Sequence, residues 1–163
     1  MTYLFRTMLA YLRARFVLPR ARIHRTERRV GLFEIDTNVH MNQRVYPEVA
    51  ELSRLEWFVS SGLWERMRSQ GINPVVAEQH IAYRRELAPF ARYTIDTRPV
   101  AVKGRLMHVQ HWFVVGDRVH TRIDVMVLFI GPDGVLSPEA VEALITPELQ
   151  APLPVEGWQI VRN

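Results

Sequence analysis

The sequence contains no cysteine, and only one of its 21 basic residues, Lys103, is a lysine. The missing thiols exclude disulfide scaffolds, cysteine-ligated zinc or iron–sulfur sites and a cysteine nucleophile. The serine motif G-x-S-x-G is absent as well. Any hydrolytic chemistry in this chain therefore has to rely on a carboxylate or an activated water.

Length and composition indicate one ordinary globular domain with a short appendage: 163 residues, 48% hydrophobic and 23% charged. The net charge of +4 is unevenly distributed. Residues 1–30 contain eight arginines and a single acid, whereas acids slightly outnumber bases in the remaining chain. This distribution argues against a uniformly basic nucleic-acid binder, so no nucleic-acid partner is predicted.

Residues 1–20 are predicted to form a basic amphipathic helix. Apolar side chains recur at helical spacing from Leu4 to Phe16, and Arg6, Arg13 and Arg15 interrupt them. The segment is too short and too charged to span a bilayer. Three roles stay open: a helix packed on the body or on a partner chain, an interfacial membrane helix over residues 1–18, or a targeting segment.

Residues 21–146 are predicted to form an α+β domain, and residues 147–163 an extended tail. A first strand is expected over residues 22–35, a long buried helix over 43–60 and a short helix over 63–70. From residue 75 to 130 the alternation of side chains indicates antiparallel strands, the first of them ending near residue 87. Hairpin turns are expected at residues 103–104 and 116–117, and a final helix is expected after Ser137.

The densest polar cluster is the segment 36–42, which lies between the first strand and the long helix. Amide groups at a helix N-terminus carry partial positive charge and can stabilise an oxyanion, and a nearby carboxylate can attack a carbonyl or activate water. The same residue types are also ordinary capping and turn residues. From spacing alone, both interpretations stay open.

The string D-T-N-V-H-M-N-Q-x-x-Y resembles the D-x-N-x-H-M-N-N-x-x-Y signature of hotdog-fold acyl thioesterases, the 4-hydroxybenzoyl-CoA thioesterase-like enzymes and their acyl-carrier-protein thioesterase relatives. Glu51, Arg54 and the stretch Pro74–Arg85 are similar to that family too. The resemblance covers roughly residues 22–130, and Gln43 stands where a second Asn is usual. It implies a five- to six-stranded antiparallel sheet wrapped around one central helix.

The same resemblance implies a site and partners. Asp36 would act as nucleophile or general base, with His40 and Asn42 positioning the thioester or water and the amides around Met41 and Asn42 polarising its carbonyl. Further substrate-binding residues would be Asn38, Met41, Tyr46, Arg84 and Arg85. The substrate would be an acyl-CoA or acyl-carrier protein bound by a homodimer or homotetramer. No cofactor or metal is implied, and the expected location is cytoplasmic, with membrane-peripheral contact as an alternative.

Several residues outside the loop have two interpretations. Arg84 and Arg85 either contact a CoA phosphate or form a solvated face with salt bridges. Glu51, on the long helix, is either a catalytic acid or a partner in helix capping and pairing. The strand histidines at 80, 108, 111 and 120 are interpreted as sheet residues, because His108 and His111 fall on opposite faces and suit a metal poorly.

Two other functions compete with thioester hydrolysis. Hydratases of the same fold carry D-x-N-P-x-H, but here Asp36 and His40 are four residues apart and the proline is absent. A non-catalytic acyl-ligand or membrane-associated protein, using the basic N-terminal helix, is the alternative from a different class.

Overall fold

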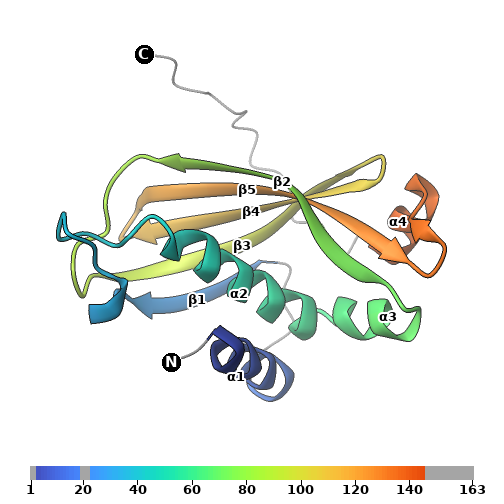
Figure 1. The fold of residues 1–163 in the computed structure, drawn as a ribbon, viewed down its shortest axis with the longest axis horizontal. Coiled ribbons are helices and arrows are strands. Elements are labelled where there is room, and N and C mark those ends of the chain that lie inside the picture. Colours follow the sequence, from blue (N-terminus) through green and yellow to red (C-terminus); the bar gives the residue numbers. More distant parts are fainter. Residues whose placement is uncertain (1–2, 19–22, 146–163) are drawn as a thin grey trace, which may run out of the picture.

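The computed structural model describes residues 3–18 and 23–145, and the predicted tail 147–163 lies outside them. The described helices and strands follow one another in a single α+β arrangement (Figure 1). In chain order they are α1 (Tyr3–Phe16), β1 (His24–Arg29), the 3-10 helix η1 (Leu32–Glu34), α2 (Val45–Ser60), α3 (Leu63–Ser69), β2 (Asn73–Tyr83), β3 (Arg92–Lys103), β4 (Leu106–Val115), β5 (Arg118–Gly131), β6 (Gly134–Val135) and α4 (Pro138–Leu144).

The strands form one antiparallel sheet in the order β1-β3-β4-β5-β2, and the short β6 pairs with β5. The sheet curls around α2, as predicted for the hotdog arrangement (Figure 1). Gly104 and Gly116 adopt positive φ angles of 59° at the β3–β4 and β4–β5 turns, a conformation that glycine reaches without a steric penalty. Both hairpin predictions are therefore confirmed.

The core lies between α2 and the concave face of the sheet. Twelve of the sixteen residues of α2 are buried, which explains why its sequence is apolar on nearly every side. Trp57 of α2 and Phe113 and Phe129 of the sheet are among the largest fully buried side chains. Removing this apolar area from water supplies the main driving force for the sheet to close on the helix.

Two predicted strand ends differ from the structure. β1 ends at Arg29, not near residue 35, because the chain turns into η1. β2 ends at Tyr83, so Arg84 and Arg85 follow the strand and do not belong to it. The final helix begins as predicted, since the Ser137 hydroxyl accepts a hydrogen bond from the Ala140 amide at 3.3 Å and Pro138 follows directly.

α1 packs against the outer side of α2, away from the sheet (Figure 1). Its contact side carries the small buried residues Ala10 and Ala14, together with arginines that pair with acids of the body. Of the three roles left open by the sequence, packing on the body is therefore observed for residues 3–16.

Candidate functional site

The segment 36–42 forms a closed loop between η1 and α2. A β-bridge joins Ile35 to Met41 across its base, and the Asp36 amide donates to the His40 carbonyl at 2.9 Å. The Val39 amide donates back to the Asp36 carbonyl at 3.0 Å. These bonds hold the chain in a tight excursion that presents Asp36 immediately before the central helix.

The Asp36 carboxylate is anchored through one oxygen. Its Oδ1 accepts hydrogen bonds from the Asn38 amide at 2.9 Å and, more weakly, from the His40 amide at 3.4 Å. Among the described residues, none donates to the second oxygen, Oδ2. The side chain is half-buried. A carboxylate fixed by one oxygen, with the other oxygen available, is arranged to accept a proton or to attack an electrophile.

Val39 adopts a left-handed backbone conformation with φ of 62° at the tip of this loop. A β-branched residue is strained there, because its Cβ crowds the backbone, at a cost on the order of 1 kcal/mol. Its side chain is 62% exposed, so no buried apolar contact compensates for the strain. The loop therefore stores backbone strain next to Asp36, as functional loops often do.

The two amides expected to form an oxyanion site are both already engaged. The Met41 amide donates to the Leu87 carbonyl at 2.9 Å, and the Asn42 amide donates to the Glu34 carbonyl at 2.7 Å. Neither N–H can donate to a second strong acceptor without breaking a backbone bond that fixes the loop. In this structure both amides that the resemblance implied for an oxyanion site are thus occupied by backbone carbonyls.

The next amide along the chain, that of Gln43, has no acceptor among the described residues. It lies one residue before Arg44, the N-cap of α2, where unpaired amides and the helix dipole favour negative charge. The Gln43 carbonyl accepts a hydrogen bond from the Tyr83 hydroxyl at 3.4 Å, which ties this point to the end of β2. Sequence spacing could not show that Gln43, and not Met41, has the available amide, because the carbonyl that occupies the Met41 amide belongs to Leu87, 46 residues away.

The segment after β2 lies against the loop and brings several predicted residues together. The Met41–Leu87 bond joins the two segments, and the His40 ring approaches the Glu86 carboxylate at 3.3 Å. Arg84 and Arg85 are exposed, and neither guanidinium has an ion-pair partner among the described residues. The pair is therefore solvated, as one of the two interpretations expects, but it forms no salt bridge among the described residues.

The remaining predicted site residues differ in how far they are buried. Met41 and Tyr46 are 3% and 2% exposed and belong to the hydrophobic core, where the Tyr46 ring packs against those of Tyr83 and Phe113. Asn38 is exposed at the loop tip. The Asn42 side-chain oxygen accepts from the Arg44 amide at 3.0 Å, which forms an Asx turn just before α2.

His40 and Asp36 do not form the side-chain pair that a hydratase requires. The Asp36 carboxylate contacts the backbone amide of His40, while the His40 ring is directed to Glu86. Glu51 is exposed on α2. In the described part of the chain, no group of three or more His, Asp or Glu side chains is placed to hold a metal ion.

A second polar cluster is buried beneath the middle of α2. The Ser53 hydroxyl lies 2.7 Å from that of Thr97, and the Thr97 hydroxyl lies 2.9 Å from His111 Nδ1. Arg54 Nη1 lies 3.3 Å from His111 Nε2. Because a guanidinium can only donate, Nε2 accepts and Nδ1 carries the proton given to Thr97. Burial, with the nearby Arg54 charge, lowers the pKa of His111 well below 6.5, so the ring is neutral.

Glu56 forms a third polar cluster on the side of α2 that faces α1. Its carboxylate, 2% exposed, bonds His24 at 2.9 Å and lies 3.6 Å from Arg28 and 3.7 Å from Arg13. Burial alone raises the pKa of Glu56, yet the His24 bond and the two arginines together hold it below its ordinary value. The carboxylate is therefore charged and fully paired.

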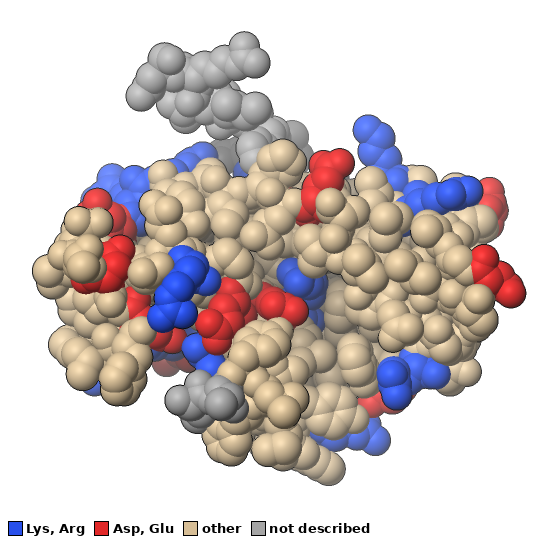
Figure 2. All heavy atoms as spheres, in the orientation of Figure 1, with Lys and Arg blue, Asp and Glu red and all other residues tan. Residues whose placement is uncertain are grey.

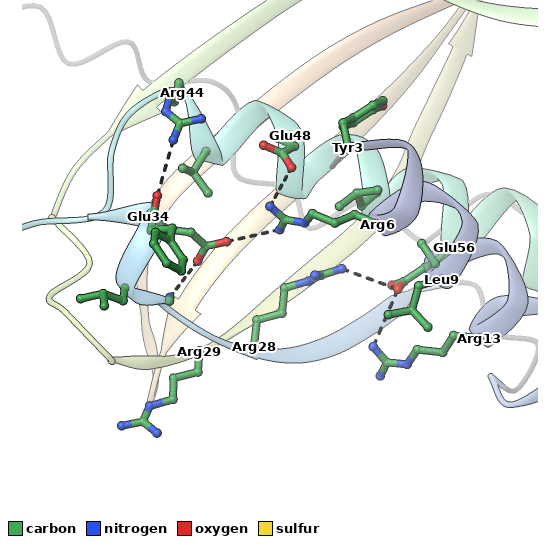
Figure 3. Close-up of a pocket in the computed structure, with 16 residues that line it drawn as sticks. Tyr3, Arg6, Leu9, Arg13, Arg28, Arg29, Glu34, Arg44, Glu48 and Glu56 are labelled. Atoms are coloured by element: carbon green, nitrogen blue, oxygen red, sulfur yellow. Dashed lines mark hydrogen bonds and ion pairs between the residues drawn. The ribbon is translucent and has the colours of Figure 1, made fainter. Parts of the chain in front are cut away.

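A cavity of about 590 Å³ lies between α1, β1, η1 and α2. Figure 3 shows arginine and glutamate side chains converging in it, with Arg6 reaching from α1 to Glu34 and Glu48. Its lining includes Glu34 and Arg44, which flank the loop, but not Asp36. It therefore borders the candidate site without containing the carboxylate.

Comparison with known proteins gives a consistent family. The model of the thioesterase-like superfamily matches residues 30–151. A segment of 81 residues is 33% identical to Protein THEM6 from Xenopus laevis, covering 50% of this chain and 39% of that protein. The chain thus spans about two fifths of the length of this curated relative.

Solved structures share the fold at low sequence identity. The probable thioesterase YbaW from Escherichia coli is 21% identical with a TM-score of 0.68, over 71% of this chain and 90% of that one. The protein SAV2348 from Staphylococcus aureus, in complex with CoA, is 16% identical with a TM-score of 0.70, over 88% and 93%. A 4-hydroxybenzoyl-CoA thioesterase variant complexed with 4-hydroxybenzoyl-CoA is 15% identical with a TM-score of 0.64, over 77% and 100%. The chain belongs to the thioesterase-like superfamily and has the hotdog fold.

Proposed function

We propose that this member of the thioesterase-like superfamily hydrolyses an acyl thioester, with Asp36 as its catalytic carboxylate. The observation that carries the proposal is the Asp36 side chain, held through Oδ1 by backbone amides with Oδ2 left available beside the start of α2. A thioester is a reactive carbonyl, so one carboxylate and one oxyanion donor are sufficient in principle.

Two routes are open to this carboxylate. As a nucleophile, Oδ2 attacks the thioester carbon, the C–S bond breaks to release a thiolate, and water then hydrolyses the mixed anhydride. As a general base, the carboxylate takes a proton from water, whose oxygen attacks the same carbon. In water labelled with ¹⁸O, repeated turnover that places label in the Asp36 carboxylate identifies the nucleophilic route.

The oxyanion donor in this proposal is the Gln43 amide. It replaces the amides of Met41 and Asn42, which already bond to Leu87 and Glu34. Its place just before α2 adds the favourable field of the helix N-terminus. His40, paired with Glu86, and Asn38 would contact the substrate at the edge of the loop.

The direct test is release of free thiol from a panel of acyl-CoAs of increasing chain length, comparing the natural chain with Asp36→Ala. Hydrolysis that the variant lacks supports the proposal. Release that the variant retains, or no release from any substrate, contradicts it. Acyl-CoA binding without any turnover would favour a non-catalytic acyl-ligand protein, and hydration of crotonyl-CoA would favour a hydratase.

We also propose that Arg84 and Arg85 bind the phosphates of CoA, which distinguishes CoA from smaller carriers. Both side chains are exposed beside the loop, without ion-pair partners among the described residues. Replacing both with alanine should raise KM for an acyl-CoA about tenfold and leave KM for the matching acyl-pantetheine, which has no nucleotide phosphates, unchanged. Arg105→Ala, in the distant β3–β4 turn, is the matched control. Equal effects on both substrates would contradict the assignment.

Assembly of two chains through β2 completes the proposal. β2 is an edge strand of eleven residues in the sheet order, and Val75 and Val76 on it are each 42% exposed. A long exposed edge with apolar side chains is a template for pairing with another strand. Light scattering should therefore show a homodimer or tetramer, and Val76→Lys should shift it toward monomer. A monomer at micromolar concentration would contradict this part.

A further inference from the structure

Helix α1 is packed with its polar side inward and its apolar side outward. Its outward side carries five large apolar residues, all between 43% and 79% exposed: Leu4, Phe5, Met8, Leu12 and Phe16. Spaced three and four residues apart, they form one continuous stripe, which we call the outer stripe. An exposed stripe of this size on a helix usually marks an interaction surface.

The inward side explains why the helix holds this orientation. Ala10 and Ala14, 5% and 2% exposed, let α1 approach α2 closely. Arg6 reaches Glu48 at 2.7 Å and Glu34 at 3.3 Å, and Arg13 approaches Glu56 at 3.7 Å (Figure 3). These contacts fix the rotation of the helix, so rolling it to bury the outer stripe would remove the partners of three buried or half-buried acids.

Charge identifies the kind of surface that the outer stripe fits. α1 contains three arginines and no acid. Arg15 flanks the stripe with a side chain 53% exposed, and its pairing with Glu65 at 3.3 Å is an exposed ion pair of little strength. Two copies of this helix placed stripe to stripe would bring like charges together. An anionic surface with an apolar interior satisfies both the stripe and Arg15.

Position and length agree with such a surface. α1 is the outermost layer of the molecule on its side, and the surface over it is largely uncharged (Figure 1, Figure 2). Its fourteen residues extend about 21 Å, and none of the described helices is long and apolar enough to cross a membrane. Lying flat, the helix can insert the stripe about 5–10 Å below the headgroups.

We propose that α1 docks this protein onto anionic phospholipid bilayers, with the outer stripe in the headgroup–acyl boundary and Arg15 at lipid phosphates. The proposal goes beyond thioester hydrolysis and does not depend on it. Because the contacts with α2 use the opposite side of the helix, docking leaves the fold intact.

The chain offers a clean probe because it contains no natural cysteine. Met8→Cys, on the outer stripe, and Asp133→Cys, in the β5–β6 turn, each carry a single environment-sensitive fluorophore on the full-length protein. Vesicles of phosphatidylcholine with 30% phosphatidylglycerol should shift the emission at position 8 to the blue, with quenching by spin-labelled acyl chains, and leave position 133 unchanged. No shift at position 8, or equal shifts at both positions, overturns the proposal.

Sedimentation with the same vesicles gives an independent test. The double variant Phe5→Glu/Leu12→Glu should bind at least about tenfold more weakly than the natural chain, while Val135→Glu, an equally exposed apolar residue on β6, should bind normally. Thermal unfolding checks that both variants are folded. Undiminished vesicle binding by the double variant contradicts the proposal. So does an oligomer that the natural chain forms with rising concentration and the double variant does not, because a second copy would then cover the stripe.

Discussion

The central helix is flanked by two kinds of polar cluster, and they are satisfied in different ways. Beneath its middle, buried side chains form a chain in which each member bonds the next: Ser53, Thr97, His111 and Arg54. Before its first turn, the Asp36 carboxylate is held by one oxygen only and remains half exposed. Both clusters consist of polar residues beside the same helix, yet only the second leaves a reactive atom available.

This difference separates polar groups that specify the fold from groups that can perform chemistry. A buried polar group contributes to the fold by being bonded, because an unmet bond in the interior costs about 1–3 kcal/mol. A catalytic carboxylate needs the opposite arrangement, fixed in place yet with one oxygen unoccupied. Substitutions in the two clusters should therefore affect different measured quantities, activity in the loop and stability in the interior.

The largest effect is expected for Asp36→Asn. The Asn side-chain oxygen can still accept from the amides of Asn38 and His40, so the loop and the unfolding free energy should change little. Loss of the ionised oxygen should lower kcat about 100- to 1,000-fold. Thiol release and urea unfolding of the same preparation check this pair of outcomes, and a large loss of stability would show that Asp36 is mainly a turn residue.

Glu56→Ala should have the reverse signature. Removing this carboxylate leaves His24 and Arg28 without their buried partner, so we expect the unfolding free energy to fall by about 3 kcal/mol. The folded fraction should keep its kcat, since Glu56 does not contact the loop. Glu56→Gln preserves shape but not charge, so its unfolding free energy should lie between those of the natural chain and Glu56→Ala. A loss of kcat in the folded fraction of either variant would contradict the separation of stability effects from activity effects.

The neutral His111 makes the unfolding free energy depend on pH. Its folded pKa lies below the unfolded value near 6.5, so the unfolded chain binds more protons and stability falls as the pH drops below 6.5. The slope contributed by one group is at most about 1.4 kcal/mol per pH unit. Urea unfolding between pH 8 and 5 should show a shallower decline for His111→Gln than for the natural chain. Parallel curves would contradict this assignment.

The smallest effect is expected at Val39. Glycine relieves the left-handed strain but adds freedom to the unfolded chain, so the unfolding free energy of Val39→Gly should change by less than about 1 kcal/mol. If the strain positions Asp36, kcat should fall severalfold with KM nearly unchanged. Val39→Ala, which retains most of the strain, is the control and should keep kcat.

The sequence predicts the fold well because periodicity reports burial. The alternation in β4 and β5 and the apolar helix predicted over 43–60 both follow from which side chains face the core. The structure confirms both, with the helix beginning at Val45. The position of the polar loop before α2 follows from the same pattern. Its internal hydrogen bonds do not, since Met41 bonds Leu87 and Asn42 bonds Glu34 through tertiary contacts that spacing does not encode.

The orientation of α1 could not be predicted from the sequence for a related reason. Amphipathic periodicity shows that one side of a helix is apolar, but not which side meets the body. Here the arginines find acids on α2 and η1, and these partners lie 28 or more residues away in the chain. The usual expectation of an apolar side packed inward is therefore reversed by ion pairs.

The Arg6–Glu34 contact joins the outer helix to the candidate site through very few bonds. Glu34 receives Arg6 on its carboxylate and, through its carbonyl, the amide of Asn42. Thermodynamic linkage makes any such connection reciprocal: whatever factor docking of α1 applies to the affinity for an acyl thioester, the thioester must apply to docking. A bound acyl thioester would then raise or lower the affinity for a membrane surface by the same factor by which the surface changes the affinity for the thioester. Vesicle-binding isotherms with and without a non-hydrolysable acyl-CoA measure that factor directly.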